Sequence, residues 1–297
     1  MFRTDNQIND ESKRIYFDTL DTSLGSDCIE IIIKENKIHK LNEPHHNPWK
    51  QRKIAYTTLI EDTLKNNSIC DSVVRICLGD QPKTGHFNFC RVKNKNGYFM
   101  VPTFRFFNDN VVNTKYYEFE TNSLKWDDVT KYIFDNDKNF LDKQSSFYMC
   151  GGLQDHTKYN RQTYFNKIET TNLFKGYMWK GGGTNFKHFS EHFNYRFPVY
   201  MDGATNSDRF RLLMCLNAVP FYCSSPYEEF YTYLLQPNEN YIEVPNVDHL
   251  EEKYNHIKDN LDLQKNIINN NKKFVCNVLT YDNILRYTAD IVNELYR

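Results

Sequence analysis

Ser207 and Arg209 stand at a point of the sequence where a phosphate group could bind. A polar, turn-forming run at residues 202–207 precedes a segment with helical apolar spacing at residues 210–216. Asn206 or Ser207 is therefore predicted to cap the start of a helix. The free N–H groups of a helix start and the Arg209 guanidinium both favour phosphate oxygens. The alternative is that Arg209 is a solvated residue on a helix surface.

Gly151, Gly152 and Arg161 form a second set of residues suited to an anionic ligand. The two glycines end a predicted strand at residues 145–150, and they would let a ligand approach the backbone closely. Arg161 opens a predicted helix at residues 161–168 and supplies another cation. The alternative is that Arg161 is an ordinary arginine on a helix surface.

Asp80 is a candidate site residue because it follows a β-branched run at residues 72–78. This run is predicted to be a buried strand, and Asp80 would lie at its carboxyl end. Sites in α/β proteins are built at the carboxyl ends of strands. The alternative is a structural turn aspartate, since Asp beside Gly79 and close to Pro82 is common in turns.

The elements around these residues alternate between strand and helix, which predicts parallel strands with helices packed on them. Ligands of such sheets bind in the loops that follow the strands. The predicted strands are 28–33, 72–78, 145–150, 198–201, 218–222 and 241–244, and the predicted helices are 52–65, 126–134, 161–168, 210–216, 230–235, 249–260, 263–278 and 281–296.

Composition excludes several classes of protein. The 297 residues suffice for one large or two ordinary domains. A net charge of −1 gives no strong attraction to nucleic acid or to an acidic membrane. No apolar run is long enough to span a bilayer, and the polar N-terminal stretch does not resemble a signal peptide. The eight cysteines are scattered without a Cys-x-x-Cys motif, so we expect reduced thiols and a cytoplasmic location.

Two stretches carry a resemblance to a known family. The first begins at Ser207 and reads SDRFRLLMCLNAVPF, and the second begins at Ser225 and reads SPYEEFYTYLLQPNENYIEV. They resemble the C-terminal signature of glycosyltransferase family 90, which includes KDEL-motif protein O-glucosyltransferases and capsule-associated xylosyltransferases. The resemblance implies an α/β GT-B fold with two Rossmann-like domains. It implies an acceptor-side domain at residues 1–143 and a nucleotide-sugar-binding domain at residues 144–297, whose last helix packs back on the first domain.

The resemblance also implies an activity. Members of the family are inverting transferases that move xylose or glucose from a UDP-sugar to a hydroxyl group of a glycan or a protein. The expected partners are therefore a UDP-sugar donor and a glycan or glycoprotein acceptor, with no nucleic acid and no membrane span. We expect no cofactor and no metal, because arginines take the place of a metal at the diphosphate.

Residue roles follow from the same resemblance. Asp80 lies in Gly-Asp-Gln-Pro, which resembles the family's Arg-Asp-Tyr-Pro, so it is the expected general base. The run Met-Cys-Gly-Gly that ends at Gly152 resembles Phe-Arg-Gly-Ser, with Cys150 in place of the arginine. Gly151, Gly152, Arg161, Ser207 and Arg209 are then expected to bind the donor. Glu229 falls where such enzymes bind the ribose hydroxyls, and a solvated acidic residue at a helix start is the alternative.

Two other hypotheses remain open at this point. Asp135 and Asp137 form an Asp-x-Asp sequence of the kind that holds a metal ion in GT-A transferases. A non-catalytic module that binds glycans or nucleotides is the second alternative, and the missing arginine at Cys150 favours it. His188 and His192 lack a third metal ligand, so a place at the surface or at the edge of the core is expected.

Overall fold

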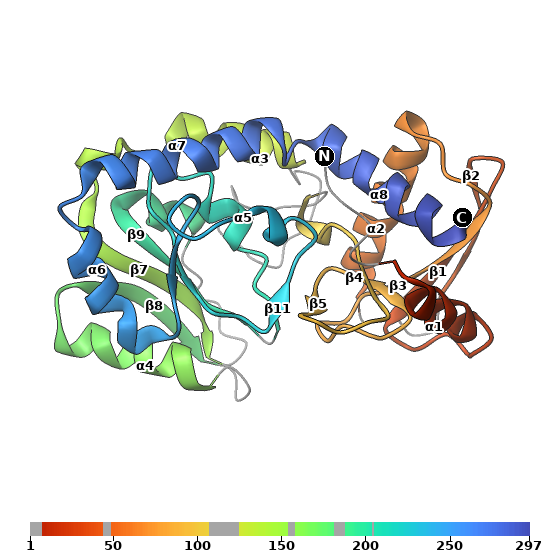
Figure 1. The fold of residues 1–297 in the computed structure, drawn as a ribbon, viewed down its shortest axis with the longest axis horizontal. Coiled ribbons are helices and arrows are strands. Elements are labelled where there is room, and N and C mark those ends of the chain that lie inside the picture. The colour runs from red at the N-terminus through yellow and green to blue at the C-terminus, as the bar shows by residue number, and fades with distance from the viewer. Residues whose placement is uncertain (1–7, 44–48, 107–124, 154–157, 181–187, 204) are drawn as a thin grey trace. The chain divides into compact units, whose positions relative to one another are not determined.

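The computed structural model describes residues 8–43, 49–106, 125–153, 158–180, 188–203 and 205–297 (Figure 1). The chain divides into two compact units, both of mixed α/β structure. The first unit consists of residues 1–109, 226–233 and 279–297, and the second consists of residues 110–225 and 234–278. The helix at the C-terminus of the chain therefore groups with the N-terminal half of the sequence.

The sheet of the first unit is mixed. Its strands run in the order β2-β1-β3-β4-β6, and β1 is antiparallel to both of its neighbours, while β3, β4 and β6 are parallel. Glu35 and Asn36 both have positive φ, as the two-residue turn between β1 and β2 requires. The strands are β1 (Cys28–Lys34), β2 (Lys37–Asn42), β3 (Ser72–Cys77), β4 (His86–Asn88) and β6 (Tyr98–Met100).

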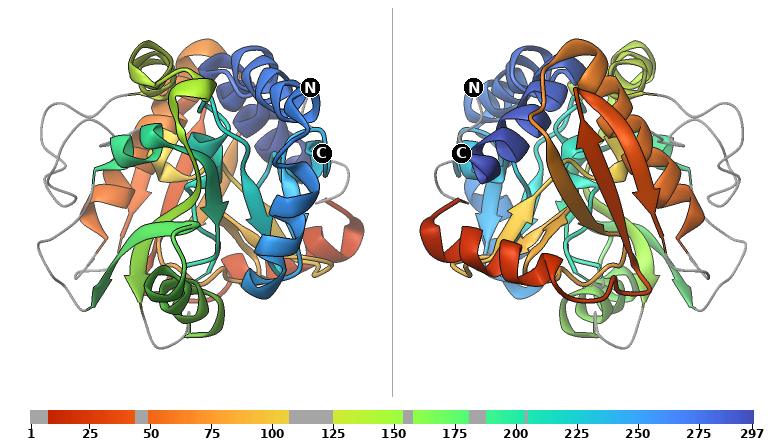
Figure 2. Two further views of the ribbon diagram at one scale, coloured as in Figure 1. Left: turned by 90° about the vertical axis from the view of Figure 1, so that its left-hand side faces the viewer. Right: turned by 90° about the vertical axis from the view of Figure 1, so that its right-hand side faces the viewer.

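Three helices complete the first unit. The right-hand view of Figure 2 shows α1 and the β1–β2 hairpin nearest the viewer. Helix α2 contacts α8, and α8 in turn contacts β3. A short antiparallel ladder joins β5 (Arg91–Val92) to β11 (Tyr227–Glu228). The helices are α1 (Asp10–Leu20), α2 (Lys50–Asn66) and α8 (Tyr281–Tyr296), with a 3-10 turn at η1 (Phe104–Phe106).

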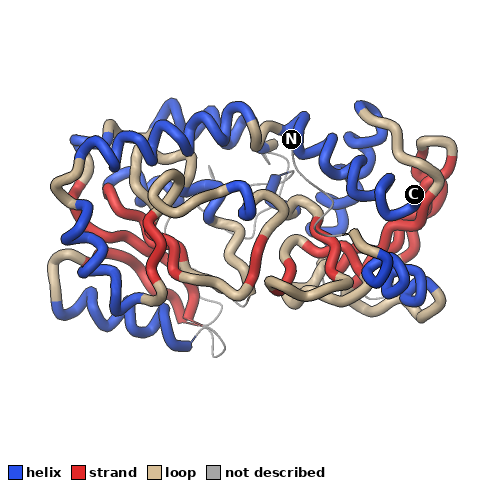
Figure 3. The backbone as a smooth tube through the Cα atoms, in the orientation of Figure 1, coloured by secondary structure: helices blue, strands red, loops and turns tan. Residues whose placement is uncertain are grey.

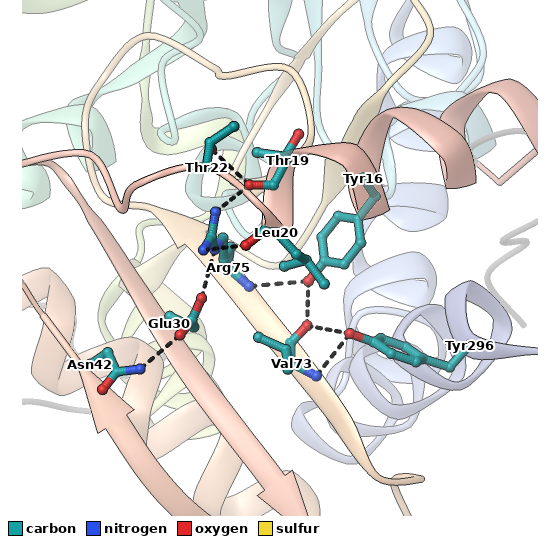
Figure 4. A network of polar contacts seen from close by, with 9 residues as sticks. All are labelled: Tyr16, Thr19, Leu20, Thr22, Glu30, Asn42, Val73, Arg75 and Tyr296. Carbon is teal, nitrogen blue, oxygen red and sulfur yellow. Dashed lines mark hydrogen bonds and ion pairs between the residues drawn. The ribbon is translucent and has the colours of Figure 1, made fainter.

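A buried polar network ties α1 and α8 to β3 (Figure 4). Arg75 on β3 forms an ion pair with Glu30 (Nε to Oε2, 2.7 Å) and donates to the carbonyl oxygen of Leu20 at the end of α1 (3.0 Å). The Tyr296 hydroxyl of α8 donates to the carbonyl oxygen of Val73 (2.8 Å). The bonds of Arg75 satisfy a guanidinium that would otherwise be costly to bury.

The sheet of the second unit is entirely parallel. Its strands run in the order β12-β10-β9-β7-β8, drawn in red in Figure 3. In chain order the first strand therefore lies between the second and the third, which is the order of a doubly wound sheet. The strands are β7 (Gln144–Leu153), β8 (Phe174–Lys180), β9 (Tyr195–Tyr200), β10 (Phe221–Cys223) and β12 (Ile242–Val244).

Helices cover both faces of this parallel sheet. Phe147, Val199 and Phe221 point to one face and pack in a core with Tyr164 of α4 and Ile267 of α7. On the other face the rings of Tyr200 and Tyr222 stack at 4.6 Å, and Phe210 of α5 packs edge-on against both. The helices are α3 (Trp126–Asn136), α4 (Lys158–Thr170), α5 (Phe210–Leu213), α6 (Leu250–Ile257) and α7 (Leu261–Asn277).

Two of the predicted helices differ from the structure. Residues 230–235 do not form an α-helix, because β11 ends at Glu228 and only a 3-10 turn, η5 (Thr232–Leu234), follows. The helix predicted after Ser207 is a single turn, α5, which begins at Phe210. Among the described helices, none combines the length and the apolar character that crossing a bilayer requires.

Candidate active site

The parallel sheet of the second unit has a switch point between β7 and β9. The chain leaves β7 toward β8 on one side and returns to β9 on the other. In sheets of this kind, ligands bind beyond the carboxyl ends of the two strands at the switch point. At those ends lie Gly151 and Gly152 of β7, together with Tyr200 of β9 and Met201, which directly follows β9.

Arg161, on α4, joins the ends of these two strands. Its guanidinium donates to the carbonyl oxygens of Gly152 (Nη1, 2.7 Å) and Met201 (Nη2, 3.4 Å), and the residue is only 7% exposed. A side chain at Gly151 would place its Cβ 3.1 Å from Nη1, so glycine makes room for this contact. Arg161 therefore links the two strand ends through its Nη atoms, and its buried Nε–H has no acceptor among the described residues.

Arg209 brings a second guanidinium to the same strand end. Its Nη1 donates to the carbonyl oxygen of Cys150, two residues before the carbonyl group that Arg161 binds. Burial and the charge of Arg209 together lower the pKa of Arg161 to about 10. Within the described part of the chain, no carboxylate forms an ion pair with either arginine. Two positive charges held this way suit an anion with two negatively charged oxygens.

Ser207 does not supply a free helix start. The N-cap of α5 is Arg209, and no side chain caps the helix. The backbone N–H of Ser207 donates to the hydroxyl of Tyr200 (3.1 Å), and that hydroxyl donates to Asn206 Oδ1 (2.7 Å). The predicted helix cap at Asn206 or Ser207 is therefore wrong, whereas anion binding at this turn stays a prediction. The physical reason is that the polar run folds back on the Tyr200 hydroxyl instead of capping a helix. A contact through the Ser207 hydroxyl stays a prediction.

His192, expected at the surface or at the edge of the core, is instead buried in the second unit beside Tyr148 of β7. It is fully buried in a 3-10 turn, η4 (Phe189–Asn194), and it packs edge-on against Tyr148 at 4.7 Å. Its Nδ1 donates to the carbonyl oxygen of Phe189 (2.9 Å). Burial, with the nearby charge of Arg209, lowers the pKa of His192 to about 3. The histidine is therefore neutral at pH 7, a state that its sequence context does not reveal.

Asp80 lies in the first unit, in the turn that follows β3. Its Oδ1 accepts a hydrogen bond from Arg52 Nη2 (2.6 Å), and its side chain is 43% exposed. The partner arginine comes from α2, and sequence reasoning did not identify it. An exposed carboxylate at a strand end, oriented by a cation, has the chemistry of a general base.

Glu229 also lies in the first unit, between β11 and the turn η5. It is 1% exposed, and its Oε1 accepts a hydrogen bond from the Tyr231 hydroxyl (3.3 Å). The neighbouring Glu228 forms an ion pair with Arg91 at 2.6 Å. Glu229 therefore does not share a unit with Arg161 and Arg209, and it is not a solvated residue at a helix start.

Asp137 is buried inside the second unit. Its Oδ1 lies 2.6 Å from Lys143 Nζ, and its Oδ2 accepts a hydrogen bond from the Asn217 backbone N–H (2.5 Å). Both oxygens are thus bound within the protein, which argues against the Asp-x-Asp metal site. Across the described ranges, no group of three or more His, Cys, Asp or Glu side chains is arranged to hold a metal ion.

Comparison with known protein families gives a match over nearly the whole chain. The model of glycosyl transferase family 90 matches residues 18–296. No curated protein matches the sequence. The matched region contains every candidate residue described above, and it spans nearly the whole chain. The protein therefore belongs to glycosyl transferase family 90.

Proposed function

We propose that this protein is an inverting glycosyltransferase that moves glucose or xylose from a UDP-sugar to a hydroxyl group of a glycan or protein acceptor. The observation that carries the proposal is the pair of guanidinium groups, Arg161 and Arg209, at the switch point of a parallel sheet. Membership in a glycosyltransferase family supports a sugar donor as the ligand. A GT-B arrangement of two Rossmann-like domains, divided at residue 143, belongs to the same proposal.

The donor diphosphate is the group that the two arginines would stabilise. As the bond between sugar and phosphate breaks, negative charge develops on the leaving diphosphate, and fixed cations lower the energy of that state. Arg209 and Arg161 would each supply one positive charge. Gly151 and Gly152 leave the backbone open to close approach. Glu229 as the ribose ligand remains part of this proposal.

Asp80 would act as the general base. A sugar or serine hydroxyl attacks the anomeric carbon as Asp80 takes its proton, and the bond to UDP breaks on the opposite face. A positioned base of this kind contributes about 10²–10⁴-fold to the rate. One displacement of this type inverts the configuration at the anomeric carbon. No cofactor is required in this mechanism, and the arginines take the place of a metal ion.

A non-catalytic binding module is the second candidate function, and Cys150 is the observation that favours it. The arginine that the family motif places there is missing, so one phosphate contact is lost at that position. Arg209 reaches the backbone of Cys150 and brings its charge to the same place. Because this second cation of the family signature is retained beside Cys150, the enzyme is favoured over the binding module.

A panel of UDP-sugars tests the proposal. Each sugar nucleotide is assayed for UDP release, with water or a glycan as the acceptor, and for its effect on the melting temperature. We expect UDP-glucose or UDP-xylose to be consumed and UDP to stabilise the fold. Stabilisation without any turnover would assign the binding module instead. A cytoplasmic location remains a separate expectation that this assay does not address.

A further inference from the structure

Arg52 of α2 binds two points of the turn that carries Asp80. Its Nη1 donates to the carbonyl oxygen of Leu78 (2.6 Å), and its Nη2 donates to Asp80 Oδ1 (2.6 Å). The two acceptors lie two residues apart in the chain. One guanidinium therefore fixes both the backbone of the turn and the carboxylate that projects from it.

The guanidinium of Arg52 is itself held in place. Its Cζ lies 4.2 Å from the centre of the Trp49 ring, and the arginine side chain is 17% exposed. The Asp80 side chain is more open, at 43%. A backbone hydrogen bond also holds the turn, because the Leu78 N–H donates to the carbonyl oxygen of Asp27 (2.7 Å). The carboxylate is thus oriented by a fixed partner and still accessible to an incoming hydroxyl.

Orientation matters for a residue that removes a proton. A general base must lie about 2.6–3.2 Å from the hydroxyl that it deprotonates. A misplacement of about 1 Å can lower a rate about 10²-fold. An unrestrained aspartate samples several rotamers, and only a fraction of them points at the acceptor. Arg52 cannot replace the base, because a guanidinium stays protonated in proteins.

We propose that Arg52 is the positioning residue for Asp80, and that it acts on proton removal from the acceptor only through that carboxylate. This inference rests on the proposed function, in which Asp80 is the base. This positioning requires the two Nη donors of a guanidinium, since a single ammonium group cannot bind Leu78 and Asp80 in the same planar geometry. Lysine at this position is therefore expected to keep the charge and lose the function.

The experiment compares Arg52→Lys, Arg52→Met and Lys53→Met. The matched control, Lys53, is the next residue of α2, and it forms its ion pair with Glu43 (2.7 Å). Turnover is measured as UDP release from UDP-glucose and UDP-xylose, with water as the acceptor, and UDP affinity is measured by calorimetry. We expect both Arg52 variants to lose roughly 10²-fold in kcat. The UDP affinity of both Arg52 variants should equal that of the wild type, and Lys53→Met should keep the wild-type kcat.

The double variant Arg52→Lys/Asp80→Asn separates positioning from other roles. If Arg52 acts only through Asp80, adding Arg52→Lys to Asp80→Asn causes no further loss of kcat. Losses that multiply, or an Arg52→Lys enzyme with wild-type kcat beside an inactive Asp80→Asn enzyme, would overturn the inference. Full activity of Asp80→Asn would instead refute the proposed base. If Arg52→Met does not fold, Arg52→Lys alone decides the outcome.

Discussion

Arg161 and Arg209 bind carbonyl oxygens only two residues apart on β7, those of Gly152 and Cys150. Like charges repel, and the lowered pKa of Arg161, about 10, reflects burial together with the charge of Arg209. This repulsion, which the Asp202 carboxylate offsets in part, favours a bound counterion. A bound diphosphate would relieve it, which gives the first prediction.

Arg209→Ala should weaken UDP binding about 10–100-fold, because a charged hydrogen bond contributes about 1.5–3 kcal/mol. Arg209→Lys should recover part of the affinity through its charge. Isothermal calorimetry measures the effect. The matched control is Arg196→Ala, since Arg196 also donates to carbonyl groups, those of Phe140 and Leu141, but from the amino end of β9. Equal UDP affinity in wild type and Arg209→Ala would remove Arg209 from the donor site.

Turnover should survive removal of divalent metal. The two guanidinium groups carry the positive charge that a metal ion would otherwise bring to the diphosphate. UDP release should therefore be the same before and after treatment with EDTA. A loss of activity that manganese restores would instead indicate a metal-dependent donor site.

Asp137 and Lys143 should behave as a coupled buried pair. Their side chains are 1% and 0% exposed, so Lys143→Met leaves an uncompensated carboxylate in the interior. Removal of one partner from a buried pair costs about 3–5 kcal/mol, whereas replacement of both is often close to neutral. We expect Lys143→Met to be strongly destabilised and Lys143→Met/Asp137→Asn to recover much of the loss. Urea unfolding measures both, and Arg297→Met, which breaks an exposed pair with Glu294, is the control.

Apolar periodicity predicts the long elements of this fold. The predicted helix at residues 281–296 is α8, with the same bounds, because its buried residues recur every three to four positions along one face. The periodicity fails at residues 230–235, which form an irregular segment. There the Phe230 ring stacks on the Tyr287 ring, with 4.8 Å between the ring centres. A short apolar run cannot distinguish a helix from a buried turn. Helix α1 was missed because only Ser12 and Tyr16 are buried in it.

The candidate site could be predicted where it depends on strand ends. Gly151, Gly152, Arg161 and Arg209 meet in one unit because parallel strands bring their carboxyl ends to one edge. Arg52 could not be identified in this way, since a single arginine on a helix gives no signal of a turn 28 residues away. A helix cap is also hard to predict because other acceptors can bind the same backbone N–H groups. At Ser207 the backbone N–H donates to the Tyr200 hydroxyl.

His192 should make stability depend on pH. Burial holds its folded-state pKa near 3, below its ordinary value of about 6.5, so the unfolded chain binds more protons between these values. Stability is therefore fully present above about pH 6.5 and falls as the pH drops toward 3, by about 1.4 kcal/mol per pH unit. His192→Asn should remove this slope in urea unfolding from pH 7 to pH 4.5. The exposed His39→Asn is the control, and an unchanged slope in His192→Asn would contradict the assignment.

Asp80→Asn tests the reaction itself. The substitution keeps the shape of the side chain and an oxygen for Arg52, but an amide cannot accept a proton from the acceptor hydroxyl. Transfer should therefore fall by about 10²-fold or more, with UDP affinity unchanged because the guanidinium pair belongs to the other unit. Asp71→Asn is the matched control, since Asp71 accepts a hydrogen bond from Glu35 N (2.8 Å) just before β3 begins. NMR of the wild-type product should show a β linkage from an α-linked donor. Near-normal turnover in Asp80→Asn, or a product that retains the donor configuration, would exclude Asp80 as the base of a single displacement.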